Sequence, residues 1–415
     1  MSAAVPAKSD IKLREDRRFI LGVLSTGHGI SHWFDQGFLV LLPSITASLG
    51  LSTLQVGSLA TIRQVGFGLV NLPGGLVVDM FKGQWGLILT GCLVWSALSY
   101  ALLGASYSYP VLIVAVIMIS LPGALWHLPA TAALSQRFPD WRGFAISIHG
   151  FGANVGNILG PIVAGALLLI VAWRGILFIY AVPALFMALA VWIFLQNIGR
   201  DGAGEERRDF KTQLQAARAL LRNRIVINLA GVALLRDMAL NSLFIWTPFY
   251  LRDVIGMGDF RMGVHMALLT GMGVVSTPVL GALSDRFNRK LILAPGLALS
   301  AILLALVVSA GGGIGLTLVL AAIGLFSFAL HQIIQAAVLD EVSLGTEATA
   351  IGFLFGAGSV VGAFSNLIAV AIINGFGLEN LFYYQAALTG AAFLLLLPLS
   401  ISRKTPTDQI GSLRS

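Results

Sequence analysis

The sequence predicts an all-α polytopic membrane protein with twelve transmembrane helices in two six-helix repeats. Three observations lead to this prediction. Of 415 residues, 57% are hydrophobic and only 11% are charged, whereas soluble domains carry about 25% charged residues. Twelve apolar segments follow one another, each with the roughly 20 residues that a spanning helix requires and without the alternation of a strand. The two halves of the chain also share a loop pattern and a histidine-containing stretch.

The apolar segments divide the chain into two bundles and three polar parts. The segments span residues 19–46, 53–79, 85–105, 109–134, 143–171, 174–197, 223–252, 260–285, 290–310, 314–342, 347–374 and 379–402. They predict an N-tail at 1–18, a bundle at 19–197, a linker with an amphipathic helix at 198–222, a bundle at 223–402 and a C-tail at 403–415.

The distribution of basic residues predicts the orientation in the membrane. With twelve spans, 21 of the 26 Lys and Arg residues lie on one side and three on the other. Loops on the cytoplasmic side are enriched in Lys and Arg. We therefore expect both termini in the cytoplasm, in a cell membrane of the bacterial inner-membrane type.

A short loop pattern occurs once in each half of the chain. The downstream copy, GALSDRFNRK at 281–290, contains Gly281, Asp285, Arg286 and Arg289, and the upstream copy retains Gly75 and Asp79. A connection this short between two spanning segments must be a tight loop at the membrane surface. We expect both loops to take part in gating.

This loop pattern is similar to the signature of the major facilitator superfamily, which occurs between helices two and three and again between helices eight and nine. Asn288 stands where that family usually has glycine, and Asn is the next most tolerant residue of left-handed backbone. The resemblance implies a transporter with its substrate site at mid-membrane between the two repeats.

The first apolar segment carries His28, His32 and Asp35 at positions i, i+4 and i+7, on one helix face. Two histidines and a carboxylate in one row can take up and release a proton near neutral pH. They are therefore predicted to couple transport to protons. The alternative is that the three side chains satisfy one another by hydrogen bonds at a helix contact.

Two arginines lie inside apolar segments, Arg63 in the second and Arg236 in the seventh. A charge at the bilayer centre costs at least about 2.5–3.5 kcal/mol, and arginine offers a planar fork to a carboxylate or phosphate. Both arginines, with Asp237, are therefore candidates for binding an anionic substrate. The alternative is internal pairing, Arg63 with Asp35 and Arg236 with Asp237. Adjacent helix positions point about 100° apart, so Arg236 and Asp237 are not expected to face a cavity together.

Two histidines occupy corresponding places in the repeats, since ALWHLPATAA (124–133) aligns with ALHQIIQAA (329–337). These residues, His127 and His331, are candidates for lining the substrate site, with two separate interfacial hydrogen bonds as the alternative. Further candidates for polar lining are His149, Asn154, Asn157, Gln332, Gln335 and Asn366.

The fifth apolar segment contains a row of small residues and a proline, namely Gly156, Gly160, Pro161 and Gly165. Small residues at this spacing allow helices to approach closely. The row resembles the antiporter motif of drug-exporting branches of the superfamily, with Ala164 where the family has glycine. Together with the histidines of the first segment, it is similar to fosmidomycin-resistance-type exporters. That resemblance implies export in exchange for protons.

The sequence contains no motif for binding a nucleotide or a metal. The chain has no GxxxxGK[ST] and no HExxH, and its single cysteine, Cys92, excludes an internal disulfide and a cysteine metal site. We therefore predict no cofactor, no metal and no nucleic-acid partner. The expected partners are a small molecule, protons and the lipid bilayer, with the protein as a monomer.

The combined prediction is a proton-coupled exporter of a small organic anion. An importer of such an anion on the same fold is the main alternative. A polytopic membrane enzyme or receptor is a second alternative, but an enzyme should show paired carboxylates or metal-ligand spacing at a membrane face.

Overall fold

The computed structural model describes residues 15–199, 222–342, 356 and 358–401, without the side chains of 72–80 and 82. Each of the twelve predicted segments contains helix within these residues, which confirms the all-α fold class. Most of the N-tail, the C-tail, most of the linker at 198–222 and the start of the eleventh segment lie outside them. The chain forms two compact units, residues 1–207 with 256–267 and residues 208–255 with 268–415.

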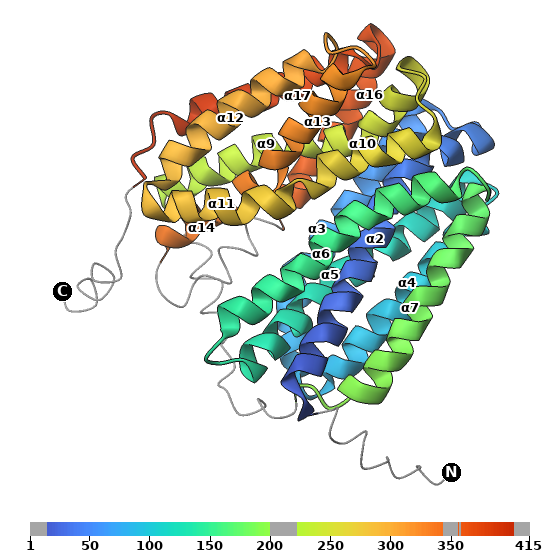
Figure 1. Cartoon of the computed structure of the whole chain (residues 1–415), viewed down its shortest axis with the longest axis vertical. Coiled ribbons are helices and arrows are strands. Elements are labelled where there is room, and N and C mark those ends of the chain that lie inside the picture. Colours follow the sequence, from blue (N-terminus) through green and yellow to red (C-terminus); the bar gives the residue numbers. More distant parts are fainter. Residues whose placement is uncertain (1–14, 200–221, 343–355, 357, 402–415) are drawn as a thin grey trace. The chain divides into compact units, whose positions relative to one another are not determined.

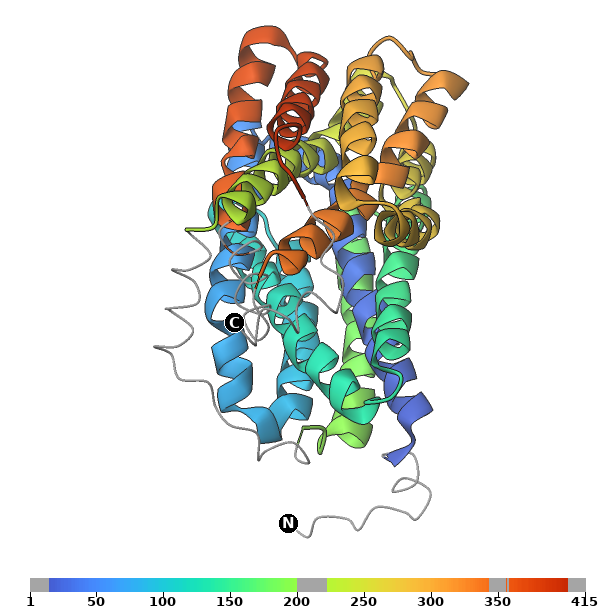
Figure 2. The same cartoon turned by 90° about the vertical axis from the view of Figure 1, so that its left-hand side faces the viewer.

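Six long helices, with the short 3-10 turn η1 (Lys82–Gln84), make up most of the first unit (Figure 1). They are α2 (Arg17–Leu49), α3 (Thr53–Met80), α4 (Trp85–Gly104), α5 (Tyr109–Arg137), α6 (Arg142–Leu167) and α7 (Trp173–Leu195). These helices run lengthwise beside one another, as Figure 2 shows. The core at one end packs Trp85 and Trp126 against Leu24, Leu89 and Leu134.

The second unit is also built of helices, but three of its predicted segments are interrupted within the described residues. Its elements are α9 (Arg224–Phe249), the π-helical turn η3 (Tyr250–Val254), α10 (Asp259–Gly271, which starts in the first unit), α11 (Gly273–Arg286), α12 (Arg289–Leu306), α13 (Ile314–Ser327), α14 (Ala329–Asp340), α16 (Ser365–Phe376) and α17 (Asn380–Leu396).

The interruptions divide segments that the sequence predicts as continuous. They lie at Met272 between α10 and α11, at Phe328 between α13 and α14, and at Phe364 directly before α16. Gly271 and Gly273 flank Met272, and each glycine costs a helix about 1 kcal/mol relative to alanine. The breaks at Met272 and Phe328 lie next to each other, because a Cβ atom on Gly273 would lie 3.0 Å from Cβ of Phe328.

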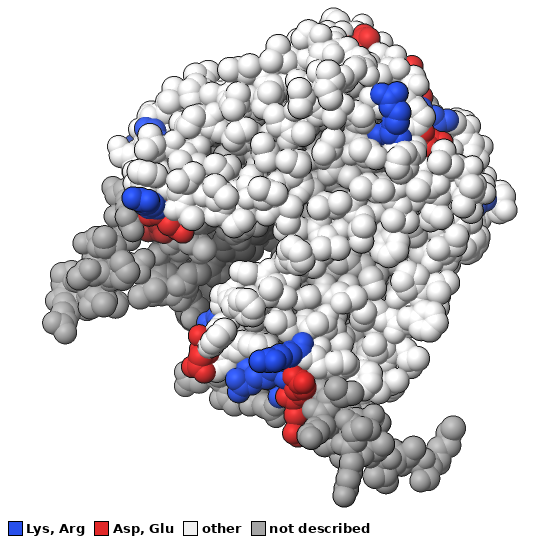
Figure 3. All heavy atoms as spheres, in the orientation of Figure 1, with Lys and Arg blue, Asp and Glu red and all other residues white. Residues whose placement is uncertain are grey.

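The helices have the length and surface of membrane spans. In the described part of the chain, nine are long and apolar enough to cross a membrane, and only 28–50% of each apolar window is buried. At least half of each window is therefore not fully buried, which leaves apolar side chains available for contact with lipid. On the face drawn in Figure 3, charged side chains lie toward helix ends and the surface between them is uncharged. Helices α2 and α3 are long enough at 33 and 28 residues but carry more polar side chains, and α17 has 17 residues.

Candidate functional site

An ion pair lies inside the first unit, between α2 and α3. Arg63 Nη2 donates to Asp35 Oδ1 over 2.7 Å, and the Tyr100 hydroxyl of α4 donates to the same oxygen over 3.2 Å. The side chains of Arg63 and Asp35 remain 22% and 32% exposed. Asp35 Oδ1 therefore accepts hydrogen bonds from two side chains on two other helices. Both members of the ion pair remain partly exposed, so a ligand can reach them.

The three polar residues of α2 meet different partners. His32 Nδ1 lies 2.9 Å from Asn157 Oδ1 of α6, and His28 Nδ1 lies 2.9 Å from the backbone oxygen of His149. The His28 and His32 rings remain neighbours, with centroids 4.7 Å apart. The residues share a face as predicted from their spacing, but Asp35 pairs with Arg63 rather than completing a row with the histidines.

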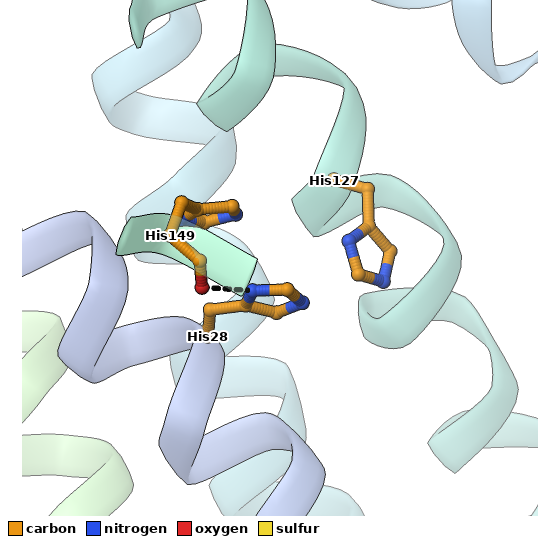
Figure 4. Close-up of side chains that lie close together, drawn as sticks. All are labelled: His28, His127 and His149. Carbon is orange, nitrogen blue, oxygen red and sulfur yellow. Dashed lines mark hydrogen bonds between the residues drawn. The ribbon is translucent and has the colours of Figure 1, made fainter. Parts of the chain in front are cut away.

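His127 joins the histidine group rather than the ion pair. Its ring centroid lies 4.6 Å from that of His28, and the rings of His28 and His149 stack with centroids 4.1 Å apart. Figure 4 shows the three rings converging from α2, α5 and α6. Four of the six histidines of the chain thus lie together in the first unit, with His32 as the fourth.

The second unit contains its own arginine–carboxylate pair. Arg236 Nη1 donates to Asp237 Oδ1 over 2.6 Å, and His331 Nδ1 of α14 lies 3.7 Å from the same oxygen. Arg236 is only 3% exposed, whereas the Asp237 side chain is 29% exposed. The neighbours point differently, as predicted, yet the long arginine side chain still reaches the carboxylate. His331 and His127 therefore have different partners despite their matched places in the sequence.

Both arginines retain unused donors. Among the described residues, Arg63 Nε and Arg236 Nη2 are buried and have no hydrogen-bond partner. Each guanidinium has five N–H groups, and each ion pair here uses one nitrogen of the fork. A small cavity beside Arg236 is also lined by Ser300, Ser327 and Thr389. Internal pairing therefore does occur, but it leaves part of each guanidinium available to another acceptor.

The glycines of α6 lie where it crosses α2. A Cβ atom on Gly156 would lie 2.8 Å from Trp33 N, and one on Gly160 would lie 3.1 Å from Gly37 N. A side chain at either position would push the helices apart. Pro161 and Gly165 instead lie against the beginning of α10, within the same unit. Helix packing thus accounts for this row of small residues.

The downstream loop is shorter than the sequence predicts. Gly281, Asp285 and Arg286 lie within α11 and Arg289 begins α12, which leaves only Phe287 and Asn288 between them. Asn288 does not adopt the left-handed backbone that Asn tolerates, because its φ of −174° and ψ of 143° are extended. Its side chain accepts a hydrogen bond from Lys290 N over 2.8 Å. Asn288 therefore serves as the N-cap of α12.

Arg289 connects three helices at this loop. Its Nε donates to Asp340 Oδ2 of α14 over 2.9 Å, and its Nη1 donates to Ser284 Oγ over 2.8 Å and to Asp285. The guanidinium of Arg286 lies over the Phe287 ring, 5.6 Å from its centroid. Gly281 is not required by local packing, since a Cβ atom there would meet nothing within 4 Å.

We expect Asp340→Asn to slow transport more than Asp285→Asn, while both proteins remain folded and inserted. The Asp340 side chain is 26% exposed and that of Asp285 is 65% exposed, and exposed ion pairs contribute only about 0–1 kcal/mol. Initial transport rates at equal amounts of purified protein would measure the difference. Equal, unchanged rates in both variants would show that this network has no part in gating.

The remaining candidates are less informative. Gly75 and Asp79 lie near the end of α3, where the described residues include no side chains. Asn366 is buried and Gln332 is exposed. Tyr100 was missed, because a tyrosine in an apolar helix gives no sequence signal that it bonds a carboxylate on another helix.

Comparisons with known proteins identify the family to which the chain belongs. The model of the Major Facilitator Superfamily matches residues 24–365 and 275–413. The chain is 22% identical over 283 residues to the fosmidomycin resistance protein of Escherichia coli strain K12, covering 66% of this chain and 67% of that protein. It is 27% identical over 269 residues to the probable nitrate/nitrite antiporter NarK1 of Thermus thermophilus, covering 62% of this chain and 58% of that protein.

The fold has a close counterpart among solved structures. A bacterial homolog to the human lysosomal transporter Spinster, in an inward-facing and occupied conformation, superposes with a TM-score of 0.75 at 16% identity. The alignment covers 94% of this chain and 98% of that one. At this level of identity the likeness shows the fold.

Proposed function

Because this chain belongs to the major facilitator superfamily, we propose that it is a secondary active transporter that exports a small organic anion in exchange for protons. Its relatives and its fold are those of transporters rather than enzymes. The observation that carries the anion assignment is that Arg63 and Arg236 each keep a buried guanidinium nitrogen without a partner in the described structure.

Charge explains why this observation favours an anion. A buried donor without a partner costs about 1–3 kcal/mol, so an oxyanion that accepts from it recovers that cost on binding. A charge-assisted bond to guanidinium is also roughly twice as strong as a neutral hydrogen bond. A cationic substrate would gain nothing from these nitrogens and would be repelled by the guanidinium charge. The name of the Thermus relative, a nitrate/nitrite antiporter, agrees with an anion.

Proton coupling is assigned to Asp35. Its Oδ1 atom accepts from both Arg63 and Tyr100, so protonating this carboxylate weakens its hold on Arg63. The freed guanidinium then offers more donors to an anionic substrate. Binding of a proton and binding of the anion are thereby linked at one side chain. Because each favours the other, this linkage alone would suit symport, and exchange is proposed on the name of the Escherichia coli resistance protein. The histidines of the first segment are not needed for this scheme, because their bonds go to other residues.

Export is the direction favoured by the name of the Escherichia coli relative, a resistance protein. The glycines of α6 contribute less to this choice, since helix packing already explains Gly156 and Gly160. The orientation with both termini in the cytoplasm follows from the excess of Lys and Arg on one side. The protein is proposed to act as a monomer in the cell membrane.

Transport by the purified protein in proteoliposomes would test the proposal. The panel consists of phosphonates, carboxylates and cationic dyes, with the membrane potential clamped at zero. We expect counterflow for an anion and none for the dyes. For proton exchange, the anion should accumulate when the lumen is more acidic than the medium, whichever way the protein is inserted.

Two controls make the result specific. Protein-free liposomes correct for diffusion of weak acids, which gather in the more alkaline compartment. Accumulation only with an acidic medium would indicate proton symport and therefore the importer. Counterflow of dyes without counterflow of any anion would contradict the proposed substrate class.

A further inference from the structure

Three histidines in the first unit bring their ring nitrogens together. His28, His127 and His149 each offer one nitrogen, and these three atoms lie within 4.8 Å of one another. The rings come from α2, α5 and α6, and those of His28 and His149 stack with their outer edges toward His127 (Figure 4). His28 is 6% exposed and His149 is 2% exposed.

The hydrogen bonds leave nitrogens of these rings available. His28 Nδ1 lies 2.9 Å from the His149 carbonyl oxygen, and since a carbonyl only accepts, Nδ1 carries the proton. In the neutral ring, Nε2 then has a free lone pair. Within the described residues His28 Nε2 has no hydrogen-bond partner, and neither His149 nitrogen has an aligned one, although the Leu24 backbone approaches that ring.

This arrangement is unfavourable as a purely structural contact. A buried polar atom left without a partner costs about 1–3 kcal/mol, and stacked imidazoles do not donate to one another. Metal-binding histidines, in contrast, typically donate one ring N–H to a carbonyl and coordinate through the other nitrogen. The bond from His28 to the His149 carbonyl has this form.

We propose that His28, His127 and His149 bind one divalent transition-metal ion of the zinc class. Imidazole nitrogen is a ligand for Zn²⁺, Cu²⁺ and Ni²⁺, whereas Mg²⁺ and Ca²⁺ require oxygen ligands. Tetrahedral zinc with Zn–N bonds of about 2.0–2.1 Å holds its ligand atoms roughly 3.3 Å apart. The three nitrogens now lie within 4.8 Å of one another. The His28 and His149 rings are stacked, so the rings must turn for their in-plane lone pairs to meet at one ion. Three protein ligands leave a fourth position for water or another ligand.

The site goes beyond anion transport and does not depend on it. Asp35 and Arg63 are not among its ligands, and the three rings belong to helices of one unit. An ion there would link α2, α5 and α6, adding to the close contact of α2 with α6 at Gly156 and Gly160. A bound ion should therefore stabilise this unit against heat.

The test uses the full chain in detergent, purified through an affinity tag without histidine and stripped with a chelator. Titration with Co²⁺ should give the visible bands of a four-coordinate ion that saturate at one equivalent. Zn²⁺ should displace the cobalt and raise the melting temperature. X-ray absorption of the zinc form should show about three imidazole nitrogens at about 2.0–2.1 Å.

Substitutions then locate the ion. His28→Ala, His127→Ala and His149→Ala should each weaken Zn²⁺ at least about tenfold, since loss of even an outer-shell partner typically costs 10–100-fold. The matched controls are His265→Ala and His331→Ala, which remove the two histidines that lie apart from the ligands and from His32, and these variants should retain the ion. Size-exclusion elution verifies that each variant is folded.

Three results would overturn the proposal. The first is a wild-type protein without a saturable cobalt site. The second is a folded His28→Ala, His149→Ala double variant that binds Zn²⁺ as the wild type does. The third is a zinc spectrum dominated by oxygen or sulfur ligands, which decides the matter even if every variant misfolds. Since none of these measurements involves transport, failure here leaves the counterflow experiment to be judged separately.

Discussion

Asp35→Asn is expected to abolish accumulation driven by a pH gradient while preserving counterflow of the substrate. Counterflow exchanges substrate for substrate and needs no net proton movement. Asn cannot release a proton, yet its oxygen can still accept from Arg63 and Tyr100, which now donate to Asp35 Oδ1. The helix contacts should therefore survive while the coupling does not.

Proteoliposomes with and without an imposed gradient would measure both activities on one preparation. The matched control is Asp140→Asn, which alters an exposed carboxylate in the connection between α5 and α6 and should behave as the wild type. Tyr100→Phe removes one donor from Asp35 but keeps the carboxylate, so it should remain coupled. If Asp35→Asn responds fully to the pH gradient, the proton path lies elsewhere.

Arg63→Ala should abolish substrate binding, whereas Arg63→Lys should retain weak binding. Lysine preserves the positive charge but not the planar fork, so it can contact an anion without a bidentate bond. A hydrogen bond to a charged group contributes about 1.5–3 kcal/mol, which corresponds to roughly a 10- to 150-fold loss of affinity for each bond removed. Arg236→Ala should weaken binding in the same range, because its free Nη2 is also buried.

Equilibrium binding of the best anion from the transport panel would provide the dissociation constants. Arg142→Ala, which removes an exposed arginine at the start of α6, serves as the control and should bind normally. Binding of a neutral or cationic compound that neither Arg63→Ala nor Arg236→Ala affects would show that both arginines are structural partners of Asp35 and Asp237. The anion assignment would then be wrong.

Local properties of the chain determined the fold class. The length and apolarity of the segments predict spanning helices, because the bilayer thickness sets the length and the need to satisfy backbone hydrogen bonds sets the helix. The paired loops led to the major facilitator superfamily, and the family match confirms that resemblance. Asp35 and Arg63 could be chosen as candidates from the sequence, because a charge inside a membrane-spanning segment is costly and is usually kept for a function.

Only the tertiary structure decided which of these side chains meet. The three converging histidines are 99 and 22 residues apart in the sequence, so no spacing rule predicts their group, and a metal site was not expected. The bond from Tyr100 to Asp35 joins α4 to α2 and is equally invisible in either segment alone. The backbone conformation of Asn288 could not be predicted from the sequence either, because it is extended as the N-cap of α12 and so depends on where that helix begins. Helix formation is governed by nearby residues, whereas side-chain partners across helices depend on how the whole bundle packs.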